Sequence, residues 1–487
     1  METKYLSISE IHNKLKNKEL SVKELINDVH KNLESHLSSN FLVTLLENDF
    51  DGDELQKMFD EQNLLSAIPF VTKDNFSTKG ILTTAGTKIL ENYYPPIDAT
   101  ITKKLKDKNT ILLGKSSLDE LGMGGTGLFG FNGEVHHPFD KDRIAGGSSS
   151  GSAYAVAAGL VPFATGSDTG DSIRKPASFN GIVGFKPTYG SISRYGVIPY
   201  APSLDHLGYF TRSVEDVAIL CDATYGYDEK DFTSIDNTNE YYKNFSKSPK
   251  QIKFGFIKQV EKYMKTDLKD SYEKLFEKIK KDGHTIEYID FNEQLLESIP
   301  AVYMMISFSE AVSTHADLDG INFGLRAEGS DYIEIMKKSR TKYFGPNVKK
   351  RFTIGSLQLK KENQEELLNR SKKVRTLIIQ EIKKLYEKID ILILPPSFSV
   401  APLIKDVLGT DIEDRDDNQG VWIEDILILG NMSGMPSITL PFIKENNLPI
   451  GINLNAKPKA DLELLQASNY LEQLLSKVIN KEGKFNE

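Results

Sequence analysis

The chain has 487 residues, a formal net charge of −9 and 39% apolar residues, including 25 Phe and 20 Tyr. This apolar content is enough for a folded core, and it argues against a disordered chain. The acidic balance argues against a surface built mainly to grip nucleic acid, because phosphate contacts need clustered Lys and Arg.

Three further features of the sequence exclude other classes of protein. The longest apolar runs, such as "ILILPP" at 391–396, are far shorter than the roughly 18 to 20 residues that cross a membrane. The first residues, "METKYLSISEIHNK", lack the apolar core of a secretory signal. The single cysteine, Cys221, excludes a disulfide framework and Cys-rich metal sites, and its apolar surroundings predict a buried thiol. We therefore expect a cytoplasmic protein with no membrane contact and no metal site.

Residues 5–36 predict two helices at the start of the chain. Ser7 with Glu10, and again Ser21 with Glu24, have the spacing of a capping box, in which the serine and the glutamate each satisfy a backbone N–H group of the other. Apolar residues follow both pairs at helical spacing. Each helix should therefore bury one face.

The segment from about 65 to 225 has a different composition from the residues before it. Glycine, serine and alanine concentrate in it. "TILLGKSS" (110–117) predicts a buried strand that enters a loop, and "SAYAVAAGLVPFATG" (152–166) predicts a helix that stops at Gly159 before a short strand. The polar, turn-rich residues 226–250 predict a surface excursion.

Residues 251–480 predict further alternating strands and helices. "IKFGFI" (252–257), a charged helix to about 282 and "TIEYIDF" (285–291) have the order of an α/β unit. A helix is expected from about 363 to 388, then strands in "DILILPPS" and "PSITLPF", and a last helix from Asp461. Most strands are too far apart for hairpins. We expect residues 1–487 to form a single large α/β domain, with a mixed β-sheet covered by helices on both faces.

Three short glycine motifs suggest other chemistries. Residues 125–130, "GTGLFG", have the spacing of a dinucleotide-binding loop, but no strand directly precedes them and no helical pattern follows. Residues 146–151 have P-loop glycine spacing, with Ser152 where the phosphate-binding lysine should stand. Residues 147–151, "GSSSG", match the nucleophile elbow of hydrolases, which also needs a histidine. The candidates for that hydrolase alternative are His206, His284 and His315.

The serine-rich loops also fit a Ser–Lys chemistry. A serine hydroxyl is a poor nucleophile until a neighbouring group takes its proton. A desolvated, neutral lysine can act as that base, and Ser–Lys pairs are a known variant of the catalytic triad. In "AIPFVTKDNF" (67–76), Lys73 directly follows a short apolar segment. The sequence therefore offers both partners.

Four segments together resemble the amidase signature family. They are "PFVTKDN" (69–75), "GGSSSGSAYAVAAG" (146–159), "GSDTGDSIRKPASFNGIVGFKPTYG" (166–190) and "SLDHLGYFTRSVEDVA" (203–218). Their order and spacing match, and the likeness runs from the N-terminal helices to about residue 475. The resemblance implies that residues from about 65 to 225 form the catalytic core. Within the family, the chain is similar to the members that release ammonia from glutamine for tRNA-dependent amidation. That narrower likeness lies in residues 193–208, 319–324, 344–356, 372–378 and 424–441.

The resemblance implies a Ser-Ser-Lys triad. Ser172 would attack the carboxamide carbon of glutamine, and Ser148 would bridge Ser172 to Lys73 through hydroxyl hydrogen bonds. Neutral Lys73 would take the proton and return it to the departing ammonia. In the family, the peptide bond before the bridging serine is cis. The oxyanion would be bound by the backbone N–H groups of Thr169, Gly170, Asp171 and Ser172.

The resemblance also implies a substrate, partners and cofactors. Arg351 would bind the α-carboxylate of glutamine and Asp425 its α-amino group, with Lys350 as the alternative to Arg351. Ammonia would travel to a B subunit, where ATP and Mg²⁺ serve to activate Glu-tRNA(Gln) for conversion to Gln-tRNA(Gln), and a small C subunit would brace the pair. No cofactor is expected in this chain itself, and the tRNA would be bound mainly by the B subunit.

Two departures from the family pattern keep alternatives open. Asp171 and Ser150 stand where the family usually has glycine. A carboxylate near the oxyanion would oppose the developing charge unless it points away or pairs with a cation such as Arg174 or Lys175. The alternatives are a free-standing amidase that acts on other small amides, and a scaffold subunit that has lost catalysis.

Overall fold

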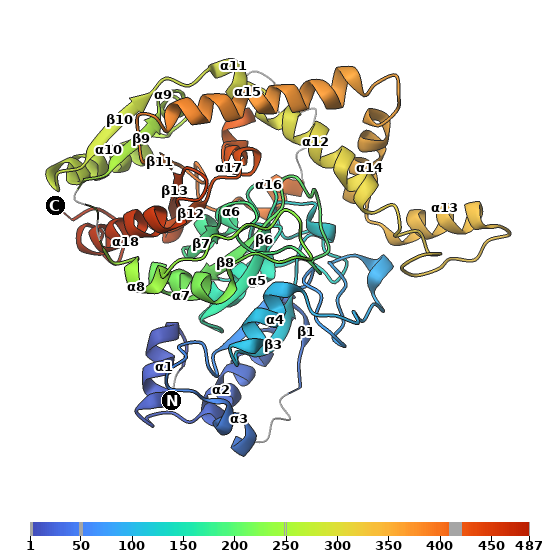
Figure 1. The fold of residues 1–487 in the computed structure, drawn as a ribbon, viewed down its shortest axis with the longest axis horizontal. Helices are drawn as coiled ribbons and strands as arrows, with labels where there is room; N and C mark the ends of the chain where they lie inside the picture. Colours follow the sequence, from blue (N-terminus) through green and yellow to red (C-terminus); the bar gives the residue numbers. More distant parts are fainter. Residues whose placement is uncertain (1–2, 48–51, 248, 250, 409–420, 487) are drawn as a thin grey trace.

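The fold of the chain, seen in a computed structural model, is built on one large β-sheet (Figure 1). The structure describes residues 3–47, 52–247, 249, 251–408 and 421–486. The large sheet has 11 strands in the order β1-β3-β2-β6-β8-β7-β12-β13-β11-β9-β10. These strands are β1 (Leu42–Leu45), β2 (Pro69–Lys73), β3 (Ile111–Ser116), β6 (Phe163–Asp168), β7 (Val183–Lys186), β8 (His206–Thr211), β9 (Lys253–Ile257), β10 (Thr285–Ile289), β11 (Ile391–Leu394), β12 (Ser437–Glu445) and β13 (Leu448–Ala456).

The sheet is mixed, as predicted. β2 runs parallel to both β3 and β6, and β9 runs parallel to both β10 and β11. The other neighbouring pairs are antiparallel. A separate ribbon pairs β4 (His136–His137) with β5 (Asp140–Ile144). The central strands β2 and β6 are buried along their whole length, which places the groups at their ends inside the molecule.

Helices cover both faces of the sheet, which also confirms the prediction. A Cβ added at Gly208 on β8 would lie 3.2 Å from Ile173, at the start of α6 (Arg174–Asn180). The next residue, Tyr209, shares a hydrogen bond with Thr224 on α7 (Val214–Thr224). Successive residues of a strand point to opposite faces, so α6 and α7 lie on different sides. The other helices of this central part are α4 (Thr100–Asp107), α5 (Ser150–Ala157), α17 (Ile428–Ser433) and α18 (Asp461–Val478).

The N-terminal helices form as the capping boxes predict. α1 (Ile8–Lys16) begins after Ser7, and α2 (Val22–Ser35) begins after Ser21. In both, the serine hydroxyl accepts a hydrogen bond from the backbone of the glutamate three residues on, and the glutamate carboxylate accepts one from the serine backbone. Each helix buries its apolar face. The short α3 (Gly52–Met58) follows them.

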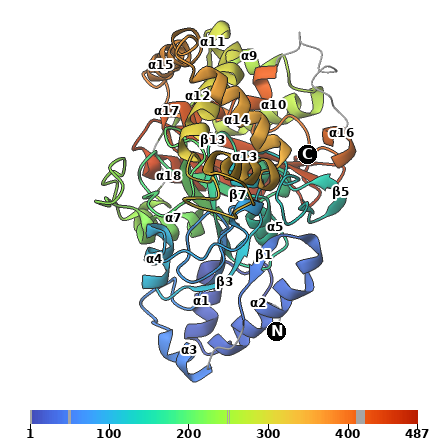
Figure 2. The same ribbon diagram turned by 90° about the vertical axis from the view of Figure 1, so that its right-hand side faces the viewer.

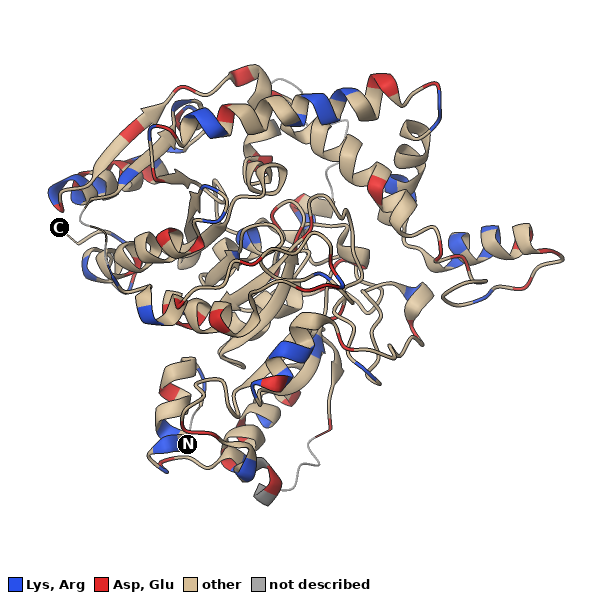
Figure 3. Ribbon diagram, viewed as in Figure 1, with Lys and Arg blue, Asp and Glu red and all other residues tan. Residues whose placement is uncertain are grey.

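A second group of helices lies at the opposite end of the molecule from α1–α3 (Figures 1 and 2). It includes α12 (Ile299–Thr314), α14 (Pro346–Gln358) and α15 (Arg370–Leu385), while α13 (Tyr332–Tyr343) projects from the body. The remaining helices are α8 (Tyr241–Asn244), α9 (Lys258–Glu261), α10 (Thr266–Lys281), α11 (Glu293–Glu297) and α16 (Ile404–Leu408). Figure 3 shows acidic and basic residues mixed along α10 and α15.

One stretch of the described residues, Glu293–Thr314, is long and apolar enough to cross a membrane by length and composition alone. It contains α11 and α12. In this fold, α12 packs against both α14 and α15. An apolar helix in a protein core has the same composition.

The segment 226–250 differs in part from the predicted surface excursion. Its described residues, 226–247 and 249, form mostly turns and loops with the short helix α8. However, Tyr241 is buried, and the Asn237 amide donates hydrogen bonds to Ser191 and to Asp461 at the start of α18. Asp461 also accepts a hydrogen bond from Tyr225 at 2.8 Å. The segment is therefore tied to the core by buried polar side chains, which its polar sequence does not reveal.

The sequence reasoning did not identify β13, which forms a hairpin with β12. Asn446 and Asn447 connect the two strands, with φ values of 52° and 65°. Asparagine tolerates this left-handed backbone, and turns of two such residues match the twist of a hairpin. The Asn-Asn pair was the available signal.

Candidate active site

Lys73 is the last residue of β2 and is completely buried. Its Nζ donates hydrogen bonds to Ser148 Oγ at 2.8 Å, Ser149 Oγ at 2.8 Å and Ser167 Oγ at 2.9 Å. The apolar residues before Lys73 place its strand in the core, and the amine then finds only hydroxyl and carbonyl partners. Such a setting suits a neutral amine.

The surroundings of Lys73 change its acidity. Burial lowers the pKa of Lys73 to about 7, although the carboxylates of Asp119, Asp168 and Asp205 act in the opposite direction. Desolvation disfavours the charged ammonium, and no carboxylate of the described residues forms an ion pair with it. A large share of the amine is therefore neutral at physiological pH and can accept a proton.

Ser148 lies in the loop before α5, and the Gly147–Ser148 peptide bond is cis, as the resemblance implies. A Cβ at Gly147 would lie 2.1 Å from the Asp119 carboxylate, so glycine is required for this close approach. The preceding Gly146 has a φ of 78°, which also favours glycine. The loop thus brings the Ser148 hydroxyl to Lys73.

Ser172 lies in the loop between β6 and α6 and is 4% exposed. Within the described part of the chain, no hydrogen bond joins its hydroxyl to Ser148, so only the Lys73–Ser148 half of the predicted relay is formed. The backbone N–H groups of residues 169–172 likewise make no hydrogen bond to a described residue. These four donors remain available for an oxyanion.

The loop is held in shape by a buried ion pair. Arg174 Nη2 donates to Asp168 Oδ1 at 2.9 Å and to the Gly170 carbonyl at 2.7 Å. Asp168 Oδ2 accepts the N–H of Ile173 at 3.0 Å. Burial alone would raise the pKa of Asp168, but the Arg174 guanidinium outweighs it and holds that pKa well below its usual range. These contacts occupy the carboxylate and the Gly170 carbonyl, so neither competes for the free N–H groups.

Asp171, one of the two departures from the family pattern, is paired with a lysine. Its carboxylate lies 3.2 Å from the ammonium of Lys175. Burial raises the pKa of Asp171, and Lys175 acts against that rise. Burial also acts to lower the pKa of Lys175, but the carboxylates of Asp171, Glu424 and Asp425 outweigh it and raise that pKa. This is the pairing that would keep a negative charge from opposing an oxyanion.

Arg351, on α14, lies among aromatic side chains. Its Nη1 donates to the Tyr200 hydroxyl at 2.7 Å, and its guanidinium lies over the rings of Tyr200 and Phe308. The Tyr303 hydroxyl is 3.2 Å from where a Cβ at Gly170 would be. Lys350 is exposed on the helix. Of the two candidates, Arg351 is therefore the one with contacts inside the molecule.

Asp425 belongs to a different element of the fold from Arg351. It ends the short 3₁₀ helix η6 (Val421–Asp425), and its side chain is half-buried. The carbonyl of the preceding Glu424 accepts a hydrogen bond from Lys175 at 2.6 Å. The Asp425 carboxylate also helps to raise the pKa of Lys175, so Asp425 lies near the loop 168–175, whereas Arg351 contacts Tyr200.

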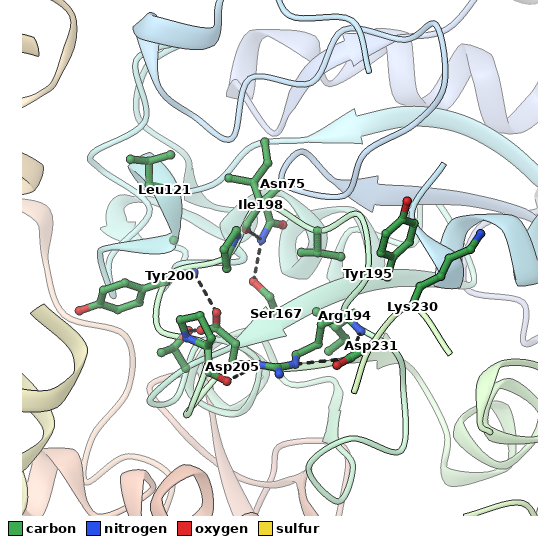
Figure 4. Close-up of a pocket in the computed structure, with 16 residues that line it drawn as sticks. Asn75, Leu121, Ser167, Arg194, Tyr195, Ile198, Tyr200, Asp205, Lys230 and Asp231 are labelled. Carbon is green, nitrogen blue, oxygen red and sulfur yellow. Dashed lines mark hydrogen bonds and ion pairs between the residues drawn. The ribbon is translucent and has the colours of Figure 1, made fainter. Parts of the chain in front are cut away.

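A cavity of about 230 Å³ lies beside Ser167, one of the hydroxyl partners of Lys73 (Figure 4). Ser167 and Thr169 line it together with Asn75, Tyr200 and Asp205. The Asn75 amide donates to Ser167 Oγ at 3.2 Å, and Asp205 accepts from the Thr169 hydroxyl at 2.6 Å. None of the site residues Ser149, Ser167, Asn75 and Asp205 was predicted. For Ser149 and Ser167, their place in the serine-rich loops was the only signal.

The structure disagrees with the glycine-motif alternatives. The Asp119 carboxylate accepts hydrogen bonds from the N–H groups of Thr126, Gly127 and Phe129. These donors of the loop at 125–130 are therefore not available to bind a phosphate. Ser149, the centre of the elbow motif, bonds Lys73 instead of a histidine. The Nδ1 atom of His206 lies 2.7 Å from the Leu204 carbonyl, and the Nδ1 atom of His284 accepts the N–H of Ile252, so neither histidine is paired with a serine through that atom.

Two other expectations can be compared with the described residues. Among them, no group of three or more His, Cys, Asp or Glu side chains is placed to hold a metal ion. Cys221 is buried, as predicted, and burial raises the pKa of its thiol well above the usual value. A thiol in that state is a poor nucleophile.

The sequence was compared with those of known proteins. The family model described as Amidase matches residues 25–465. The chain is 40% identical over 476 residues to the A subunit of glutamyl-tRNA(Gln) amidotransferase from Mycoplasma pneumoniae, covering 96% of this chain and 98% of the relative. It is 38% identical over 489 residues to the protein of the same name from Persephonella marina, covering 97% and 98%.

Solved structures agree with these relatives. The crystal structure of the A subunit of glutamyl-tRNA(Gln) amidotransferase from Thermotoga maritima matches with a TM-score of 0.77 and 30% identity, covering 100% of this chain and 98% of that one. A peptide amidase from Stenotrophomonas maltophilia matches with a TM-score of 0.82 and 21% identity, covering 99% of each chain. At that identity the second likeness concerns the fold alone.

Proposed function

This chain belongs to the amidase family, and from that premise we propose that it is the glutaminase subunit of a tRNA-dependent amidotransferase. It hydrolyses glutamine and supplies the ammonia that converts Glu-tRNA(Gln) to Gln-tRNA(Gln). Support comes from the relatives named as the A subunit of that enzyme, which are similar along almost the full length of both chains.

The observation that carries the proposal is the buried Lys73 amine next to a loop with free backbone donors. The pKa of Lys73 is lowered to about 7, and its Nζ lies 2.8 Å from Ser148 Oγ. The N–H groups of residues 169–172 have no hydrogen bond to a described residue. A base and an oxyanion site are the two parts that amide hydrolysis by a serine needs.

In the acylation step, Ser172 Oγ bonds to the carboxamide carbon of glutamine. The Ser172 proton passes through the Ser148 hydroxyl to Lys73 Nζ, and the carbonyl electron pair moves onto oxygen to give a tetrahedral oxyanion. One oxyanion donor of this kind contributes about 3 kcal/mol to lowering the barrier. When the oxyanion collapses, the C–N bond breaks and the Lys73 ammonium returns the proton to the leaving ammonia.

In the second step, water completes the hydrolysis. Neutral Lys73 takes a proton from the water by the same route, and the oxygen attacks the glutamyl ester carbon. The ester C–O bond breaks, Ser172 recovers its proton and glutamate leaves. Both steps use the same base and oxyanion site.

Arg351 and Asp425 recognise glutamine in this proposal. A guanidinium can bind the α-carboxylate with two parallel hydrogen bonds, and Arg351 is already positioned by Tyr200. The Asp425 carboxylate binds the α-amino group. The two groups distinguish an amino acid amide from a simple amide.

The partners belong to the same proposal. A B subunit receives the ammonia and binds Glu-tRNA(Gln), ATP and Mg²⁺, and a C subunit joins the two. The net charge of −9 is consistent with a chain that leaves most tRNA contacts to a partner. The complex acts in the cytoplasm, where translation takes place.

Ammonia release from glutamine tests the proposal. We expect hydrolysis by the purified chain to rise sharply with the B and C subunits, Glu-tRNA(Gln) and ATP, and to vanish in Ser172→Ala. Turnover of acetamide with no response to partners would instead identify a free-standing amidase. Failure of a fluorophosphonate to label Ser172 would identify a silent scaffold.

A further inference from the structure

Two neighbouring carboxylates, Asp119 and Glu120, lie between the triad and the helix that carries Arg351. Both follow β3, and Asp119 is 0% and Glu120 4% exposed. Neither belongs to the proposed triad or to the groups proposed to bind glutamine. Burying a carboxylate is unfavourable unless its oxygens are hydrogen-bonded, so the partners of each one indicate what it holds in place.

Asp119 is built into the catalytic loop. Its N–H donates to the Ser148 carbonyl at 3.2 Å, and its carboxylate accepts the N–H groups of Gly127 at 3.0 Å and Phe129 at 3.0 Å. It also faces Gly147, whose Cβ position lies 2.1 Å from it. Asp119 therefore fixes the Ser148 side of the site.

Glu120 points the other way, to the N-terminus of α14. Its Oε2 accepts the N–H of Gly345 at 2.9 Å, and its Oε1 accepts the Thr87 hydroxyl at 2.6 Å. Gly345 is the residue that caps α14. The first N–H groups of a helix have no partner within it and carry partial positive charge, so a carboxylate there holds the helix end. Burial raises the pKa of Glu120 to about 7, against the effect of these hydrogen bonds.

A second contact fixes the far part of α14. A Cβ at Gly355 would lie 2.2 Å from the Phe308 carbonyl on α12, so the two helix backbones touch there. Arg351 lies between the two fixed points, about 9 Å from Gly345 and about 6 Å from Gly355 along the axis. Release of the Gly345 end would let the helix tilt about the Gly355 contact and move Arg351.

We propose that Glu120 is a positioning residue for substrate binding: by anchoring the N-terminus of α14 it holds Arg351 in place, and so sets the affinity for amides that carry an α-carboxylate. The inference rests on the proposed function, because that function assigns the carboxylate to Arg351. It separates two adjacent residues by role, with Asp119 supporting the chemistry and Glu120 supporting recognition.

The test compares two substrates in the full chain, with its partner subunits present. In Glu120→Ala we expect the KM for glutamine to rise about tenfold with kcat nearly unchanged, because only binding is weakened. Hydrolysis of acetamide, which has no carboxylate, should stay within about twofold. Glu120→Gln keeps an oxygen acceptor for Gly345 and should restore most of the affinity. Thr87→Val, which removes one hydrogen bond from Glu120, should raise the KM in the same direction by less.

Two controls identify the route of the effect. Lys350→Ala changes an exposed residue of the same helix and should leave both substrates unaffected. In an Arg351→Ala background, Glu120→Ala should add no further increase in the KM for glutamine, because the two residues act in series.

Each outcome decides the inference. An equal loss on glutamine and acetamide, or an unchanged KM for glutamine in both Glu120→Ala and Thr87→Val, would overturn it and leave the proposed function standing. If the unaltered protein released ammonia from acetamide but not from glutamine, the proposed function itself would fail, and this inference with it.

Discussion

The proposed catalytic groups and the proposed recognition groups of this protein are held by different kinds of structure. Lys73 and the loop that follows Asp168 lie at the ends of β2 and β6, two strands that are buried along their whole length. Arg351 and Asp425 come from helices outside the sheet, and both are only half-buried. A sheet core fixes atoms closely because its strands are bonded on both sides, whereas a peripheral helix depends on a few contacts. Chemistry and substrate choice should therefore respond separately to mutation.

Removing the proposed base should give the largest effect. We expect Lys73→Ala to lower kcat about 10²- to 10⁴-fold for glutamine and for acetamide alike, because proton transfer is common to both. Lys79→Ala, at an exposed lysine nearby, is the matched control. Steady-state kinetics on both amides provide the measurement. A loss confined to glutamine would contradict the division between the two regions.

The pH dependence tests the same region without mutation. Because the amine must be neutral, kcat for acetamide should fall about tenfold for each pH unit below the pKa of Lys73, which is about 7. The kcat should level off above about pH 8, since the Lys73 amine is then almost entirely neutral. The linked effect on stability has the same sign. The folded pKa is lowered from 10.5 to about 7, so the unfavourable burial of the charge is fully present below pH 7 and disappears as the pH rises to 10.5. A kcat profile that rose only near pH 10 would contradict the lowered pKa.

Mutation of the proposed recognition groups should affect glutamine but not acetamide. Arg351→Ala should raise the KM for glutamine about 10- to 100-fold, because a charge-assisted pair to the carboxylate is lost. The turnover of acetamide should change little, and Lys350→Ala should change neither. Steady-state kinetics over a range of concentrations of glutamine and, in parallel, of acetamide measure the KM for glutamine and the turnover of acetamide. Equal losses on the two amides would mean that Arg351 supports the loop at Gly170 through Tyr303 rather than the substrate.

Asp171 should give the smallest effect, although it lies beside the proposed nucleophile. Since its carboxylate is paired with Lys175, we expect Asp171→Gly to change kcat by no more than about threefold. Ser150→Gly, at the other departure from the family pattern, serves as the comparison. A rate increase of about tenfold in Asp171→Gly would show that the charge opposes the oxyanion after all.

Local patterns predicted the parts of the fold that depend on neighbouring residues. The capping boxes at Ser7 and Ser21 define where α1 and α2 begin, because their hydrogen bonds span only three residues. β3, α5 and β6 likewise follow from short apolar and small-residue runs. The β12–β13 hairpin was missed although the signal at Asn446 and Asn447 is local.

The sequence by itself determined which residue types were present and in what order, and the likeness to the amidase family gave the spacing of Lys73, Ser148 and Ser172. It could not decide between Arg351 and Lys350, or say whether Asp171 is paired. Those answers depend on residues far apart in the chain, such as Tyr200 beside Arg351. Only the tertiary structure places Glu120 at the N-terminus of α14, 225 residues away along the chain. A buried carboxylate is stable only where folding brings hydrogen-bond donors to it. No local sequence pattern shows which distant residues supply those donors.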